Sequence, residues 1–198
     1  VNTLSDAVSY STPDGEDEKG ALFSEGQLIF EGGSGELVIN GNHKHAICSD
    51  DYVEVRGGTI KVPRAVSDAL HVNDSVIVVG GTLDLTAKSD GIDCDGMIRL
   101  LGGSVSVRAA SDDVKGIKSA TDILIDGAEV KVTVSGDASK GIKSTGTIVI
   151  AGGTVDISAT GNTILLNGDP SYATCIKCDS TLSITGGTVI LEATGLAG

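Results

Sequence analysis

The chain has 198 residues, a length typical of a single domain, and we expect one domain over residues 1–198. Glycine accounts for 28 residues, tryptophan is absent and aromatic residues make up only 3%, which is typical of β-strands joined by glycine turns and not of helices. The net charge of −13 argues against nucleic acid as a partner, and no stretch approaches the roughly 18 apolar residues of a transmembrane segment.

The N-terminal segment, residues 1–20, differs from the rest of the chain. Val1 to Val8 predict an incoming strand or cap, and the polar, acidic run from Ser11 to Glu18 predicts a surface loop. No secretory signal peptide opens the sequence, as expected either of a cytosolic protein or of a mature exported one.

From Gly32 onward a glycine pair followed by Thr or Ser recurs along the chain, with one degenerate copy. The copies begin at Gly32, Gly57, Gly80, Gly102, Gly127, Gly152 and Gly186, with spacings of 22 to 25 residues and a last spacing of 34. Each repeat contains two short strands of alternating polarity, a glycine turn between them, and a polar corner that leads to an apolar residue such as Ile92. Three short strands per repeat leave no room for a helix. We therefore predict an all-β fold, a right-handed single-stranded parallel β-helix of about seven coils.

Alignment of the repeats places charged residues in two columns at the polar corner. The column before the corner is His45, Asp68, Asp90, Lys115, Lys140 and Thr174. The column just after the apolar residue is Cys48, His71, Asp93, Lys118, Lys143 and Lys177. The corner is therefore expected to be acidic in its first half and basic in its second.

The acidic half is the candidate metal site, with Ca²⁺ as the expected ion. The candidate ligands are Asp68, Asp90, Asp93, Asp95, Asp112 and Asp113. Calcium takes six to eight oxygen ligands, and a cation would relieve the repulsion between carboxylates stacked one coil apart. The alternative is that these residues are solvated turn aspartates, which are common in loops.

The basic half is the candidate ligand-binding surface. It comprises Lys115, Lys118, Lys140, Lys143 and Lys177, with Tyr172 beside them as one of three tyrosines in the chain. Lysines on successive coils could receive the carboxylates of a uronic acid polymer. The alternative is a solvent-exposed face whose lysines pair with nearby aspartates.

Three further features of the sequence bear on function. Residues 158–174 carry an insertion, which shapes a binding face or covers strand edges as a protective flap. The four cysteines are expected to be free and mostly packed, with a Cys175–Cys178 bond as the alternative. His43 and His45 are expected in a surface loop and not at a metal.

The ordered combination of motifs resembles a known family. The runs 20–30 and 35–42, the triplet Asp90-Gly91-Ile92 and the segment 149–157 are similar to those of bacterial carbohydrate-binding domain-containing proteins. This resemblance implies a secreted or lipid-anchored surface protein, a β-helix similar in fold to family 9 pectate lyases, and binding of plant cell-wall polysaccharide such as cellulose or polygalacturonate. It also implies calcium at Asp-Gly-Ile corners, a pattern that is intact at Asp90 and partly kept at Asp68.

These observations predict a non-catalytic carbohydrate-binding or adhesion module for plant cell-wall or acidic polysaccharide. One alternative is a calcium-dependent polysaccharide lyase with Lys118 as its base, although nearby acidic charge would raise the pKa of that lysine. The other alternative is a structural surface module that binds a protein.

Overall fold

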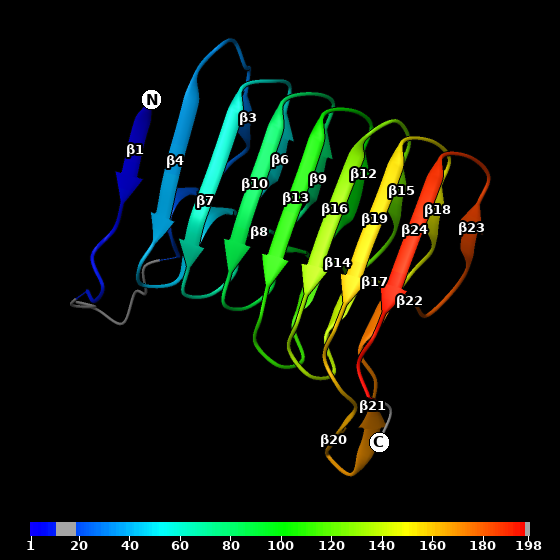
Figure 1. Ribbon diagram of the computed structural model, residues 1–198. Coiled ribbons are helices and arrows are strands. Elements are labelled where there is room, and N and C mark those ends of the chain that lie inside the picture. Colours follow the sequence, from blue (N-terminus) through cyan, green and yellow to red (C-terminus); the bar gives the residue numbers. More distant parts are fainter. Residues whose placement is uncertain (11–18, 197–198) are drawn as a thin grey trace.

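The computed structural model describes residues 1–10 and 19–196, and these residues form strands, turns and loops without a helix. Nothing in these two ranges could cross a membrane as a helix. The strands stack side by side along the molecule, as Figure 1 shows. The acidic loop expected at 11–18 lies outside the described residues.

Three parallel sheets run the length of the molecule. Sheet I contains, in order, β1 (Asn2–Ser5), β4 (Glu36–Gly41), β7 (Thr59–Ala65), β10 (Thr82–Ala87), β13 (Ser104–Ala109), β16 (Glu129–Val134), β19 (Thr154–Ala159) and β24 (Thr188–Ala193). Sheet II contains β2 (Gly20–Ser24), β5 (His45–Ser49), β8 (Leu70–Val72), β11 (Ile92–Cys94), β14 (Lys115–Ser119), β17 (Lys140–Ser144) and β22 (Thr174–Cys178). Sheet III contains β3 (Leu28–Phe30), β6 (Tyr52–Val55), β9 (Ser75–Val78), β12 (Met97–Leu100), β15 (Ile123–Ile125), β18 (Ile148–Ile150) and β23 (Leu182–Ile184).

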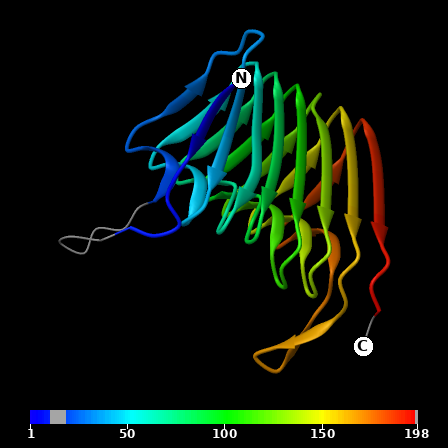
Figure 2. The same ribbon diagram turned by 60° about the vertical axis from the view of Figure 1, so that its left-hand side comes forward.

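The chain visits sheets II, III and I in turn, and each strand pairs with its equivalent in the next coil. Ile92 of β11, for example, aligns with Leu70 of β8 on one side and with Ile117 of β14 on the other. Figure 2 shows the stacked coils from a second direction. The arrangement confirms the predicted all-β parallel β-helix with three strands per repeat, and the expectation of about seven coils is close.

The interior is filled by β-branched and aliphatic side chains that point inward from all three sheets. Ile92, Ile117 and Ile142 follow one another in sheet II and are fully buried. Because each inward residue packs on its equivalents one coil above and below, the core needs no large aromatic side chain. Buried serines complete the sheet II–sheet III corner: the hydroxyls of Ser49 and Ser119 donate to the carbonyls of Gly26 and Gly96.

The glycine pairs form the corner between sheets III and I. Gly81 has φ = +82°, and a Cβ atom there would lie 2.7 Å from the carbonyl carbon of Gly57 in the preceding coil. Both the left-handed backbone and the close approach of neighbouring coils therefore require glycine.

One insertion interrupts the regular coils. Between β19 and β22 the chain forms an antiparallel hairpin of β20 (Ile164–Leu166) and β21 (Asp169–Ser171), within the segment where the repeat spacing lengthens. The hairpin projects away from the stacked sheets (Figure 1). Because it separates a sheet I strand from a sheet II strand, it leaves the molecule at the same corner that carries the charged columns.

Candidate functional site

Two charged columns follow the corner where sheet I passes into sheet II. The corner column is His45, Asp68, Asp90, Lys115, Lys140 and Thr174, and the outer column is Cys48, His71, Asp93, Lys118, Lys143 and Lys177. The strand registers confirm both alignments that the repeat predicted. A small residue and an apolar residue separate the two columns in each coil, and at the small residue Gly116 an added Cβ would lie 2.3 Å from Val132 Cγ1.

The corner column is buried although its members are ionisable. His45, Asp68 and Lys140 are 7%, 5% and 5% exposed, and Asp90 is also buried. The expectation that His45 lies in a surface loop is therefore wrong, because this residue begins β5 under the next coil. Buried charged groups need partners, and the outer column supplies several of them.

Asp68 is the centre of the acidic half. Its Oδ2 atom lies 3.1 Å from His45 Nδ1 and 3.4 Å from His71 Nδ1. The two imidazole rings are stacked, with centroids 4.5 Å apart and an interplanar angle of 17°. Burial would raise the pKa of Asp68, but the two imidazoles close to its carboxylate outweigh burial and hold that pKa below its ordinary range.

Asp90 and Asp93 lie one coil further on and share a lysine. Lys118 Nζ is 2.8 Å from Asp93 Oδ1 and 3.9 Å from Asp90 Oδ2. Burial raises the pKa of Asp90 to about 6, and repulsion from Asp68 and Asp93 adds to this effect. Burial would also raise the pKa of Asp93, but the nearby His71 imidazole and Lys118 ammonium lower that pKa overall.

These contacts bear on whether calcium fits the six aspartates. A calcium ion needs several free oxygens directed at one point, yet Asp93 faces Lys118 and His71, and one Asp90 oxygen accepts the backbone N–H of Lys115 at 2.7 Å. The remaining candidates are spread out: Asp95 is exposed after β11, Asp112 accepts the N–H of Asp137, and Asp113 lies 3.2 Å from Lys115 Nζ.

Calcium at this corner stays a prediction that the residues present do not favour. In the described ranges 1–10 and 19–196, one group of three His, Cys, Asp or Glu residues has its ligand atoms within 4.8 Å of one another, and it is His45, Asp68 and His71. Two of these three donors are nitrogens, whereas calcium selects oxygen. The column alignment already places these three residues on adjacent coils, so the repeat contained the signal for this cluster.

The five lysines of the basic half are not equivalent. Lys140 turns inward, and its ammonium donates to the carbonyl of Ala138, to Ser171 Oγ at 3.1 Å and to the carbonyl of Tyr172 at 2.6 Å. Lys115 pairs with Asp113, and Lys118 pairs with Asp93. Within the described part of the chain, Lys143 and Lys177 form no ion pair, and both lie on the outer face of sheet II.

The inserted hairpin brings Tyr172 to this face. Tyr172 lies between β21 and β22 and is 53% exposed, while its backbone carbonyl holds the buried ammonium of Lys140. The buried lysine therefore ties the end of the hairpin to the coil next to Lys143. The insertion thus contributes an exposed aromatic residue at the corner where sheet I passes into sheet II.

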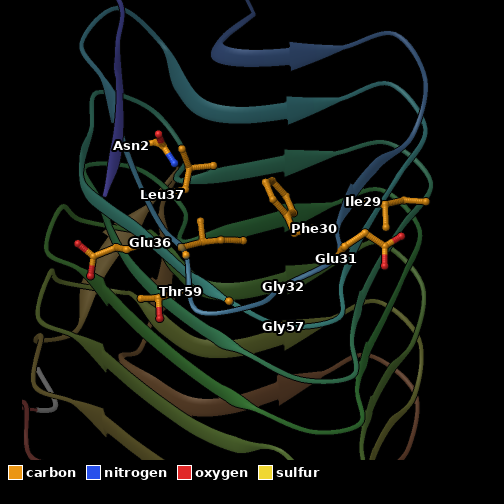
Figure 3. Close-up of a pocket in the computed structure, with 12 residues that line it drawn as sticks. Asn2, Ile29, Phe30, Glu31, Gly32, Glu36, Leu37, Gly57 and Thr59 are labelled. Carbon is orange, nitrogen blue, oxygen red and sulfur yellow. The ribbon is translucent and has the colours of Figure 1, made fainter.

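A separate cavity lies at the N-terminal end of the solenoid. It has a volume of about 360 Å³ and is lined by β1, β3, β4 and the glycine turns of the first coils, with Phe30 and Leu37 at its wall (Figure 3). Its two acidic residues are engaged, Glu31 with Arg56 and Glu36 with Lys61. Because it gathers no free ionisable groups, it is a less suitable site than the charged corner.

Comparison with known proteins gives one result. A family model described as carbohydrate-binding domain-containing protein matches residues 1–195, nearly the whole chain. No curated protein and no solved structure matches the chain.

Proposed function

The chain belongs to the family of carbohydrate-binding domain-containing proteins, and on this premise we propose that it is a non-catalytic module that holds an acidic polysaccharide against the outer face of sheet II. The carbohydrate-binding role follows from the family. The acidic character of the ligand, its origin in the plant cell wall and an extracellular setting are our proposal.

The observation that carries the proposal is the run of lysines in register on successive coils. Lys118 aligns with Lys143, and Lys143 aligns with Lys177. Coils are about 4.8 Å apart, so the last two ammonium groups repel each other unless an anion lies between them. The net charge of the protein is −13, yet in the ranges 1–10 and 19–196 no carboxylate forms an ion pair with either lysine. A polymer with regularly spaced carboxylates would neutralise both lysines at once.

Tyr172 supplies the second element of such a surface. An exposed aromatic ring can pack on the apolar face of a sugar, and this one follows a hairpin whose end Lys140 ties to the strand that also carries Lys143. The chain has no tryptophan and few aromatic residues, which disfavours a flat platform for crystalline cellulose. Charge and hydrogen bonds are therefore expected to dominate binding.

The environment of Lys118 supports a non-catalytic role over a lyase. Burial would lower the pKa of Lys118, but its ion pair with Asp93 outweighs burial and raises that pKa above its ordinary value. A general base needs a pKa near the working pH, so a lysine held in its protonated form is poorly suited. Incubation with polygalacturonate and calcium should give no ultraviolet absorbance from unsaturated products, and a steady rise would establish the lyase instead.

The binding proposal is tested by affinity electrophoresis in gels that contain polygalacturonate or a neutral glucan, with added calcium or with EDTA. We expect polygalacturonate to retard the protein, with retardation falling steeply as salt rises because the contacts are ionic. The double variant Lys143→Gln, Lys177→Gln should lose most of the retardation. Lys131→Gln, an exposed lysine on sheet I, is the matched control and should behave as the parent protein.

The outcomes separate the parts of the proposal. Retardation that is equal in the double variant and the parent would show that the sheet II face does not bind the glycan. Retardation by the neutral glucan alone would refute the acidic ligand. Absence of retardation in every gel would refute carbohydrate binding by this chain.

A further inference from the structure

Three donor atoms converge in the first half of the charged corner, independently of the lysine surface. Asp68 Oδ2 lies 3.1 Å from His45 Nδ1 and 3.4 Å from His71 Nδ1. A tetrahedral metal with bonds of about 2.0–2.2 Å separates its ligand atoms by roughly 3.3–3.6 Å. The two distances from Asp68 Oδ2 are therefore close to those between ligands of one ion, and all three donor atoms lie within 4.8 Å of one another.

The hydrogens available do not satisfy these three atoms. His45 Nδ1 is 3.3 Å from the backbone N–H of Asp68, which requires a lone pair on that nitrogen, and it is also 3.1 Å from a carboxylate oxygen, which requires a proton. Both demands cannot be met at once. His71 Nδ1 is buried without a well-formed hydrogen bond, because its two carboxylate neighbours are 3.4 and 3.7 Å away. A single cation between the three atoms would satisfy all of them.

The cluster is open to a small ion from one side. A cavity of about 220 Å³ is lined by His45, His71, Cys48 and Asp50 among others. The two rings lie in nearly parallel planes, and a lone pair lies in the plane of its ring, so one ring must turn for both nitrogens to face the same ion. The side chain of His71 is 28% exposed on the cavity side, whereas His45 is buried, so His71 is the ring with room to turn.

We propose that His45, Asp68 and His71 form a binding site for a divalent transition metal ion, with Zn²⁺ as the representative ion. Two imidazole nitrogens and one carboxylate oxygen suit zinc and its neighbours in the periodic table and do not suit calcium. The fourth position faces the cavity and is filled by water. The site lies in the first coils, away from Lys143 and Lys177, and does not depend on carbohydrate binding.

The test is isothermal titration of EDTA-treated, dialysed protein with Zn²⁺ and, separately, with Ca²⁺. We expect one Zn²⁺ per chain, no competition from excess Ca²⁺, and visible absorbance bands of a four-coordinate complex when Co²⁺ replaces Zn²⁺. His71→Gln should weaken Zn²⁺ binding by about tenfold or more, since loss of a ligand should cost at least as much as loss of a residue that only orients one. His43→Gln, two residues from the cluster, is the matched control and should keep the parent affinity.

Asp68→Asn is the second variant, and its fold is checked by circular dichroism in EDTA because Asp68 is buried. If it does not fold, His71→Gln carries the test, since that side chain is partly exposed. Absence of Zn²⁺ binding by the parent protein would overturn the site. Equal affinity in the parent and His71→Gln, or an equal loss in His43→Gln, would overturn it as well.

Discussion

Replacement of Gly116 by alanine should destabilise the protein by overpacking the corner between the two charged columns. An added Cβ would lie 2.3 Å from Val132 Cγ1 and 2.7 Å from the carbonyl oxygen of Gly141 in the next coil. Both distances are about 1 Å shorter than an ordinary contact, and the second involves backbone. To relieve these two close contacts, strands β14 and β17 must move apart or the Val132 side chain must leave its rotamer.

The magnitude follows from two opposing effects. Overpacking of a well-packed core costs about 1–3 kcal/mol. Alanine restricts the unfolded chain more than glycine does, and this effect stabilises the folded state by about 0.4–1 kcal/mol. We expect a net loss of about 1–2 kcal/mol in the free energy of unfolding, which lowers the thermal midpoint by roughly 2–8 °C for a chain of this size.

The assay is thermal unfolding followed by circular dichroism, together with urea titration. Gly26→Ala is the matched control, because an added Cβ there meets nothing within 4 Å and its backbone is not left-handed. The control should remain within about 0.5 kcal/mol of the parent protein. A Gly116→Ala variant as stable as the Gly26→Ala control would refute the view that this glycine is required by the packing of neighbouring coils.

Two further predictions concern thiols and pH. Cys48, Cys94 and Cys175 are buried and Cys178 is partly exposed, and none of the four forms a disulfide. Ellman's reagent should therefore react with Cys178 alone in the folded protein and with all four thiols in guanidinium. Rapid reaction of the other three thiols under native conditions would contradict the described packing. Burial, with repulsion from neighbouring lysines, lowers the pKa of Lys140 to about 8 from its ordinary value of 10.5. The folded state therefore favours the deprotonated side chain more than the unfolded state does, so the free energy of unfolding should rise by about 2–3 kcal/mol as the pH rises from 8 to 10.5. Lys140→Met should flatten this rise in urea titrations at successive pH values, and an unchanged pH profile in that variant would assign the effect to another group.

Much of the fold could be predicted because the repeat fixes the register. The small corner residue and the apolar residue that follows it, as in Gly116-Ile117, recur at nearly constant spacing. Alignment on them places every residue of sheet II on its neighbour in the next coil. Ser119, for example, lies between Cys94 in the coil before it and Ser144 in the coil after it.

The site was predicted less completely, because register does not determine where a long side chain turns. Lys140 was expected on the binding surface, but the inserted hairpin offers it the Tyr172 carbonyl and Ser171 hydroxyl, and it turns inward. The path of that hairpin is outside the repeat and could not be derived from it. Asp93 was assigned to calcium on the basis of its own charge, whereas its partner is the lysine one coil away.

The short run of unpaired lysines limits how tightly one copy of this protein can hold a polymer. Lys143 and Lys177 span a single coil step of about 4.8 Å, so only a few sugar units can be engaged, and the next lysine of the column, Lys118, is already paired with Asp93. Such a footprint favours rapid dissociation. Firm attachment to a long polysaccharide would then come from many copies displayed together, where each bound module raises the effective concentration of the next.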